Sequence, residues 1–154
     1  KWIILINRKI FLKKAKKIKL QKKIFLDRSS SEFNHCQIYN QRKVNQWIKK
    51  NNLSSCKPEK LTLEKQIYLF NNASIILGAH GAAFTNIIFC KPGTKIIEII
   101  PANHPNRKCE RISKILGLKY FRIVTKPDNT NKNFPFRIHL EKKHFKMIDK
   151  TINL

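Results

Sequence analysis

The stretch Ser74-Ile-Ile-Leu-Gly-Ala-His-Gly-Ala-Ala-Phe-Thr-Asn86 decides the fold of this chain. It opens with the continuous apolar run Ser74–Leu77, passes through a loop of small residues at Gly78–Ala83, and leads into the apolar segment Phe84–Cys90. An apolar run without alternation is typical of a strand that is buried on both faces of a parallel sheet. The stretch therefore predicts a strand, a tight loop and a short helix.

The same alternation of strands and helices continues on both sides of this stretch. Further strands are expected at Ile24–Asp27, Leu53–Lys57, Lys95–Ile100 and Lys119–Thr125, with an edge strand at Phe134–Leu140 after the polar linker Lys126–Asn133. Helices are expected at Gln37–Lys50, after the N-cap Thr62, at Arg107–Leu116 before Gly117, and at Lys142–Ile152. This order predicts the α/β class, with a single doubly wound Rossmann-like parallel sheet and helices on both faces.

Chain length and net charge limit the possible size of the core and the possible classes of partner. The chain has 154 residues and a formal net charge of +24, with enough apolar residues (42%) to build a core. A polyanionic partner would explain the charge. However, most of the basic residues are Lys rather than the Arg that reads phosphates and guanine, and A/T-rich codon usage would produce the same bias. Both explanations stay open.

The cysteines do not indicate a metal site. Cys36, Cys56, Cys90 and Cys109 form no CxxC pair, and no His pair stands at zinc spacing. Reduced thiols are expected, and neither a metal nor a cofactor is expected.

The first residues form a separate basic block. Residues 1–23 carry ten positive charges and no acidic residue. The predicted division is a lead-in at residues 1–22, or the stub of a missing N-terminal half, followed by a domain at residues 23–154. The block also suits a basic amphipathic helix that lies on an anionic surface.

The loop after Leu77 is the first candidate site. Ligands of open parallel sheets bind at the carboxyl ends of the strands, and Gly78, Gly81 and the alanines at 82 and 83 allow backbone to approach a ligand closely. Free N–H groups at the next helix start favour a phosphate, and His80 lies in mid-loop. The alternative is a tight turn in which the glycines serve chain geometry and His80 bonds to backbone.

Two charged residues complete the set of candidates. Glu98 lies within an otherwise apolar strand, where a carboxylate is costly unless it is paired or contacts a ligand such as a ribose. Pairing with a Lys at the sheet rim is the alternative. Arg28 ends the first strand and could direct its guanidinium at a diphosphate, or it is an exposed loop residue.

Several motifs in order now resemble a known family. They are Ile24-Phe-Leu-Asp-Arg28-Ser, Ile38-Tyr-Asn40, Pro58-Glu59 through Gln66 and Phe70 to Ala73, Gly78-Ala-His80-Gly81-Ala82-Ala-Phe-Thr85-Asn86 through Phe89, and Pro92-Gly93 through Glu98. This succession resembles glycosyltransferase family 61, of the capsular polysaccharide biosynthesis type, in its C-terminal donor-binding half. The resemblance is strong over residues 23–125 and weak to residue 154. It implies one half of a GT-B fold.

The resemblance also implies an activity and site roles. It implies metal-independent, inverting transfer of a hexosyl or pentosyl group from a nucleotide-sugar donor to a glycan acceptor. The donor-binding residues would be Arg28, His80, Gly81, Ala82, Thr85, Asn86 and Glu98, and the cleft-shaping residues Asn40, Gln66, Gly78 and Gly93. A leaving nucleoside diphosphate gains negative charge, which Arg and helix-end N–H groups stabilise without a metal.

The sequence departs from the family pattern in two respects. An Arg often precedes the Ile-x-Asn stretch, where this chain has Gln37, with Arg42 or Lys43 as substitutes. The acceptor-binding half has no counterpart in residues 1–22, so the catalytic base is not identified. His80 is the candidate, whereas Asp27 and Glu59 carry no distinguishing feature.

Three functional hypotheses follow. The first is the donor-binding half of a glycosyltransferase, with a glycan or lipid-linked glycan as acceptor, cytoplasmic and in peripheral contact with an anionic inner membrane face. The second is a basic α/β module that binds nucleic acid, although no specific nucleic-acid motif supports it. The third is a truncated, inactive glycosyltransferase relic.

Overall fold

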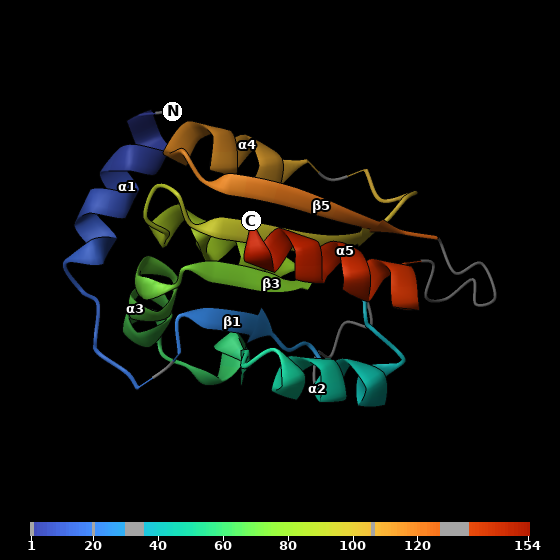
Figure 1. The fold of residues 1–154 in the computed structure, drawn as a ribbon. Helices are drawn as coiled ribbons and strands as arrows, with labels where there is room; N and C mark the ends of the chain where they lie inside the picture. The colour runs from blue at the N-terminus through green and yellow to red at the C-terminus, as the bar shows by residue number, and fades with distance from the viewer. Residues whose placement is uncertain (1, 20, 30–35, 106, 127–135) are drawn as a thin grey trace.

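A computed structural model describes residues 2–19, 21–29, 36–105, 107–126 and 136–154 (Figure 1). The elements are α1 Trp2–Leu12, β1 Lys23–Leu26, α2 Gln41–Lys50, β2 Ser54–Cys56, η1 Pro58–Lys60, α3 Leu63–Asn72, β3 Ile75–Ala79, η2 Ala82–Phe89, β4 Lys95–Pro101, α4 Lys108–Leu116, β5 Lys119–Thr125 and α5 Lys142–Asn153. The prefix η marks a 3₁₀ helix.

The five strands form one parallel sheet in the order β2-β1-β3-β4-β5. The chain first adds β2 beside β1, and then crosses back to build β3, β4 and β5 on the other side. The direction of growth therefore reverses between β1 and β3, which is the switch point where doubly wound sheets open a crevice. The predicted doubly wound Rossmann-like sheet is confirmed.

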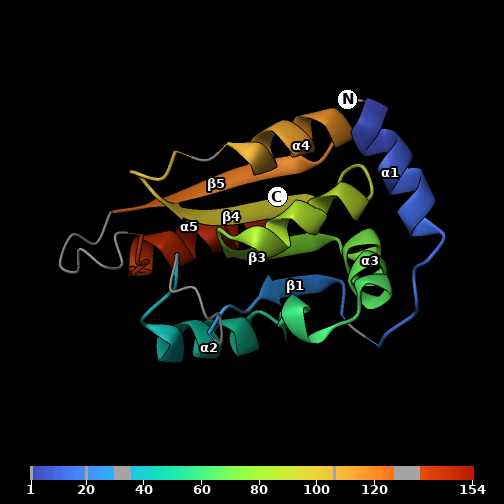
Figure 2. The same ribbon diagram turned by 180° about the vertical axis from the view of Figure 1, so that it is seen from behind.

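Helices cover both faces of the sheet, as the two opposite views show (Figures 1 and 2). On one face, side chains such as Ile76 and Ile96 pack against α3, η2 and α4. On the other face, Leu77 and Ile97 pack against α2 and α5. Neighbouring residues of one strand thus enter different cores, because side chains alternate along a strand. This explains why the strands are apolar throughout.

α2 begins later than the sequence predicts. The expected helix at Gln37–Lys50 starts at Gln41, because Ile38 forms a parallel bridge with Ile138 and the Asn40 side chain bonds Leu140. The expected edge strand Phe134–Leu140 lies partly outside the described residues, and its described part contributes this single bridge. The expected linker at residues 126–133 also lies mostly outside the described residues.

The segment after His80 is a 3₁₀ helix over Ala82–Phe89 rather than a helix over Phe84–Cys90. Its side chains Phe84, Ile87 and Phe89 are buried in the core beneath α3 and α4. An eight-residue 3₁₀ helix is unusually long. Its early start brings its first N–H groups next to Gly81 and His80.

α1 packs on the domain rather than standing apart from it. Ile4, Phe11 and Leu12 contact the core beside α3 and η2, and the Arg8 Nη2 atom donates to the Cys90 carbonyl at 3.0 Å. The division of the chain between residues 22 and 23 stays a prediction. Within the described ranges, none of the helices has the length and apolar character that crossing a bilayer requires.

Candidate functional site

Arg28 and Gly81 meet at the switch point. Arg28 follows the end of β1 by two residues, and Gly81 follows the end of β3 by the same number. The Arg28 guanidinium occupies the space that a Cβ on Gly81 would fill. The glycine at this position therefore lets a cation lie directly over the loop that leads into η2.

The surroundings of Arg28 strengthen its electrostatic effect. Burial lowers the pKa of the Arg28 guanidinium, while the Cys36 thiol, once it is ionised, and the Glu59 carboxylate act in the opposite direction. An Arg side chain nevertheless stays protonated in proteins, so a partly desolvated positive charge lies at the crevice. The small cavity beside it, about 10 Å³, is lined by Arg28, Ser29 and Ala79 among others and has room for about one water molecule.

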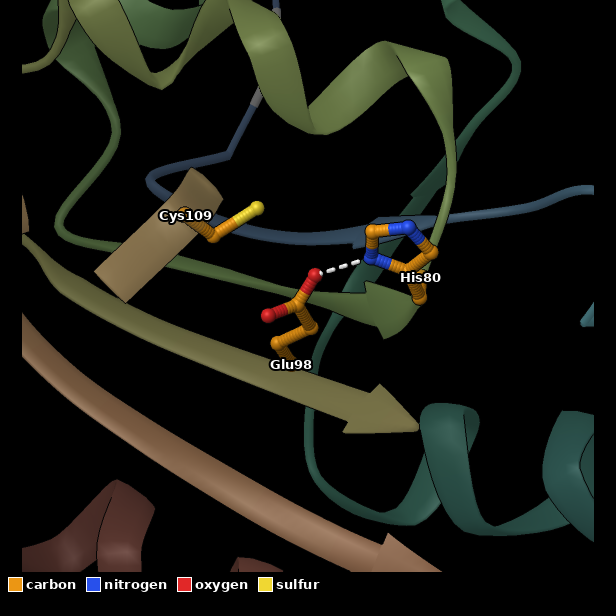
Figure 3. A group of neighbouring side chains, drawn as sticks. All are labelled: His80, Glu98 and Cys109. Carbon is orange, nitrogen blue, oxygen red and sulfur yellow. Dashed lines mark hydrogen bonds and ion pairs between the residues drawn. The ribbon is translucent and has the colours of Figure 1, made fainter. Parts of the chain in front are cut away.

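His80 is held by two contacts from β4. Its backbone N–H donates to the Ile99 carbonyl at 2.8 Å, and its Nδ1 lies 2.5 Å from Glu98 Oε1 (Figure 3). Because a carboxylate can only accept, Nδ1 carries the proton and Nε2 lies on the ring edge away from Glu98. The ring is 7% exposed. Glu98 therefore orients the His80 ring, as a carboxylate orients the histidine in many enzyme active sites.

Glu98 is enclosed by donors from three elements. Besides His80 at the end of β3, Tyr120 of β5 donates its hydroxyl to Glu98 Oε2 at 2.5 Å, and the Cys109 thiol of α4 is a third hydrogen-bond partner. Burial alone would raise the pKa of Glu98, but the hydrogen bonds from these three side chains outweigh it and lower the pKa below its ordinary value. Glu98 is therefore an ionised carboxylate in the core.

This enclosure does not fit the expected ribose contact. Glu98 is 1% exposed, and both of its carboxylate oxygens already accept hydrogen bonds from protein side chains. A ribose could reach it only by displacing His80 or Tyr120. The geometry instead makes Glu98 a residue that orients His80.

The same cluster contains metal-ligating atom types, because His80, Glu98 and Cys109 offer one ligand atom each within 4.8 Å of one another. Ligands around a tetrahedral metal with bonds of about 2.0 Å stand about 3.3 Å apart. The 2.5 Å separation between Nδ1 and Oε1 is shorter and fits a shared proton. Burial and the neighbouring Glu98 raise the pKa of the Cys109 thiol, which disfavours the thiolate that a metal needs. The contacts therefore fit a hydrogen-bonded network better than a metal centre.

His104 is a site residue that sequence reasoning missed. It lies in the loop after β4, and its ring stands 4.4 Å from that of His80 and 4.8 Å from that of Phe136, between centroids. The Arg122 Nη2 atom donates to its backbone carbonyl at 3.4 Å. The only sequence signal was its place after a buried strand at the carboxyl edge of the sheet.

The remaining donor candidates lie on η2. Ala82 and Thr85 are exposed, so both are accessible to a ligand. The Asn86 side chain instead donates to Gln66 Oε1 at 2.7 Å, and Gln66 in turn donates to the Leu61 carbonyl. The hydrogen bond between Asn86 and Gln66 thus joins η2 to α3. Gly81 precedes η2 without a side-chain cap, so the first N–H groups keep no side-chain partner from the capping position.

The cleft-shaping candidates separate into different places. Gly78 lies against β1, where a Cβ would come within 2.9 Å of the Leu26 carbonyl oxygen. Asn40 joins two distant segments, because its side chain bonds both the N–H and the carbonyl of Leu140. Gly93 is a correction: it forms the turn before β4 with a φ of +84°, at the opposite edge of the sheet from the crevice.

Three further residues named in the sequence analysis lie near Arg28 or contact the loop that contains it. Gln37, at the position where the family often has Arg, donates to the Ser29 carbonyl at 3.5 Å. Asp27 accepts from the Ser29 N–H at 2.8 Å and pairs with Lys57 at 3.8 Å. Asp27 is thereby engaged in local structure. Glu59 contributes charge near Arg28.

A separate groove of about 510 Å³ runs between α2 and α5. Its walls include Trp47, Phe145 and Asp149, and the Trp47 indole donates to Asp149 across it at 2.8 Å. Neither Arg28 nor His80 lines this groove. It is therefore distinct from the crevice at the switch point.

The fold and the crevice define a class: doubly wound α/β proteins with an anion-suited loop at the strand switch point. Residues 2–97 match the family described as Glycosyltransferase 61. The match covers more than half of the chain, and the chain belongs to this family.

Curated relatives agree over shorter stretches. The chain is 38% identical over 60 residues to a beta-1,2-xylosyltransferase of Arabidopsis thaliana, which is 39% of this chain and 11% of the relative. It is 32% identical over 63 residues to the beta-1,2-xylosyltransferase RCN11 of Oryza sativa subsp. japonica, covering 41% and 12%. It is 41% identical over 46 residues to the xylan glycosyltransferase MUCI21 of Arabidopsis thaliana, covering 29% and 9%. The aligned stretches thus span about a tenth of each relative's length.

Proposed function

We propose that this chain forms the donor-binding part of a glycosyltransferase that transfers a sugar from a nucleoside-diphosphate donor to a glycan acceptor. The observation that carries the proposal is the Arg28 guanidinium lying over Gly81 at the start of η2. A guanidinium beside the start of a helix that has no side-chain cap suits a diphosphate. Membership of the family supplies the reaction class.

The proposed role of the site is to stabilise the leaving group. In an inverting transfer, the acceptor hydroxyl oxygen bonds to the anomeric carbon while the bond from that carbon to the diphosphate oxygen breaks. The hydroxyl proton passes to a base, and negative charge develops on the diphosphate. Arg28 and the η2 N–H groups are fixed donors for that charge, so this part of the reaction needs no metal.

His80 is proposed to contact the donor from the side, with Glu98 fixing its ring orientation. Nδ1 bonds Glu98, so Nε2 lies on the edge of the ring that faces away from this carboxylate. Glu98 thereby acts as a positioning residue through His80 rather than as a ribose ligand.

The relatives suggest which donors to try first. Two of them are named as beta-1,2-xylosyltransferases. A xylose-bearing nucleoside diphosphate is therefore the first donor to compare with hexose-bearing ones. The third relative is named as a xylan glycosyltransferase, so a polysaccharide is the first acceptor to test.

Calorimetric titration of the chain with UDP and other nucleoside diphosphates, at two salt concentrations, tests the proposal. We expect saturable binding that weakens tenfold or more in Arg28→Gln, because a charge-assisted bond contributes about 1.5–3 kcal/mol. Arg111→Gln, an exposed Arg on α4, is the matched control and should bind like the wild type. Equal loss in both variants would contradict the proposal.

The same titration with a single-stranded oligonucleotide separates the nucleic-acid reading. Oligonucleotide binding that is unchanged in Arg28→Gln and is lost at high salt would favour the nucleic-acid hypothesis, because counterion release dominates binding to nucleic acids. A turnover assay with a donor and a glycan then separates an active transferase from a half-enzyme or relic, which would bind nucleotide without transferring sugar.

A further inference from the structure

The outer face of α1 stands out because apolar side chains lie on the outward as well as on the inward side of this helix. Its sequence, Trp2 to Leu12, is WIILINRKIFL. The inner face packs on the core through Ile4, Phe11 and Leu12, and Arg8 turns inward to the Cys90 carbonyl. A surface helix normally buries its apolar residues on one face and is polar on the other. The apolar side chains on the outward side of α1 therefore indicate an interaction with a partner.

That outward face carries most of the apolar side chains of α1. Five side chains of α1 are between 43% and 67% exposed, namely Trp2, Ile3, Leu5, Ile6 and Ile10. They are half of the exposed large apolar side chains in the described part of the chain. Such clustering on one helix marks an interaction surface rather than scattered surface residues. We call this set the α1 face.

The charge next to the α1 face indicates which partner fits. Lys9 lies within the helix, and Lys13, Lys14, Lys16, Lys17 and Lys19 follow it, all of them exposed. Residues 1–23 contain no acid. A partner must therefore offer an apolar interior beneath an anionic rim. An anionic lipid bilayer has this composition, and Trp is favoured at the boundary between its headgroups and acyl chains.

We propose that α1 docks in the plane of an anionic membrane, with the α1 face among the acyl chains and the lysines at the headgroups. An eleven-residue helix is about 16 Å long, so it can lie in the interface but cannot span the bilayer. α1 crosses the molecule at the end where the strands begin, whereas the strand arrowheads point toward the opposite end (Figures 1 and 2). Docking would leave the crevice at Arg28 uncovered, so this proposal is independent of the proposed function.

Sedimentation with lipid vesicles tests the proposal. The chain should bind vesicles of phosphatidylcholine mixed with phosphatidylglycerol, and not vesicles of phosphatidylcholine alone. Ile6→Glu should reduce binding tenfold or more. Met147→Glu on α5 is the matched control, because Met147 is 48% exposed and Ile6 is 49% exposed. Circular dichroism should show both variants folded, since both positions lie at the surface.

A second pair of variants tests the electrostatic part. The double change Lys13→Gln with Lys17→Gln should weaken binding by about fivefold for each charge removed. The double change Lys49→Gln with Lys146→Gln, at exposed positions on α2 and α5, removes the same charge elsewhere and should have little effect.

Three outcomes would overturn the proposal. Equal binding to neutral and anionic vesicles would remove the charge argument, and equal loss in both lysine pairs would indicate attraction by net charge alone. Ultracentrifugation that shows self-association sensitive to Ile6→Glu, without vesicle binding, would assign the α1 face to a second copy of the chain.

Discussion

At the residue scale, the site depends on the buried carboxylate of Glu98, which contacts protein side chains on both oxygens. Glu98 bonds His80 after β3, Tyr120 of β5 and Cys109 of α4, so a change at Glu98 should alter the orientation of the His80 ring. The sequence marked Glu98 as unusual because of its apolar neighbours. It could not reveal the role, because the three partners come from separate elements whose packing fixes the geometry.

Glu98→Gln should reduce the loss of folding stability that the protein shows at acid pH. A carboxyl with a folded pKa below its ordinary 4.5 stabilises the native state above that pH, and this contribution is lost as the pH falls through the folded pKa. The wild type should therefore lose stability steeply below about pH 4.5. Urea unfolding between neutral and acid pH should show a shallower loss for Glu98→Gln. An unchanged acid limb would show that other carboxylates control it.

Gly81→Ala should displace Arg28 at little cost in stability. The added methyl group would occupy the place of the guanidinium, which is the mobile end of a long side chain. Nucleotide affinity should fall about as far as in Arg28→Gln, while the thermal midpoint changes little. Wild-type affinity in Gly81→Ala would show that Arg28 does not contact the ligand.

At the scale of elements, prediction succeeded where the signal is local. β5 has the predicted bounds Lys119–Thr125, and Gly117 ends α4 in the left-handed conformation with a φ of +67°. The start of α2 was missed because Asn40 is bonded to Leu140, a partner a hundred positions along the chain. His104 was missed for the same reason, since its contact with His80 joins two loops.

Gly78→Ala should disturb the contact between β1 and β3. Its Cβ would approach the Leu26 carbonyl, which is backbone and cannot rotate away. A loss of about 1–3 kcal/mol in the free energy of unfolding is expected from such overpacking, together with weaker nucleotide binding, because Arg28 follows the end of β1 by two residues.

Gly93→Ala is the matched comparison for this change. Its φ of +84° disfavours a side chain, so it should cost about 1–2 kcal/mol. It lies at the far edge of the sheet and should leave nucleotide affinity unchanged. Equal effects of the two substitutions on affinity would argue against a crevice at the switch point.

At the scale of the whole molecule, four buried thiols set an alkaline limit. Burial raises the pKa of Cys36 and Cys90 to about 12 and that of Cys56 to about 11, and it also raises the pKa of Cys109. A raised pKa in the folded state means that stability is full below the ordinary thiol value of 9.0 and declines as the pH rises beyond it.

Chemical unfolding between pH 8 and pH 11 should therefore show a declining free energy under reducing conditions. Replacing Cys90 by Ala removes one of the titrating groups, so the decline should become shallower even where the variant is less stable at neutral pH. A slope that does not change in Cys90→Ala would assign the alkaline loss to other groups, such as Tyr120, whose pKa is also raised by burial and by Glu98.

The bond between Asn40 and Leu140 also bears on how the chain is made. The segment before α2 has its partners, Ile138 and Leu140, in the stretch just before α5. During synthesis, β1 through β5 leave the ribosome before those partners do. The nascent sheet therefore keeps one face partly uncovered until the stretch at Ile138–Leu140 and α5 have emerged.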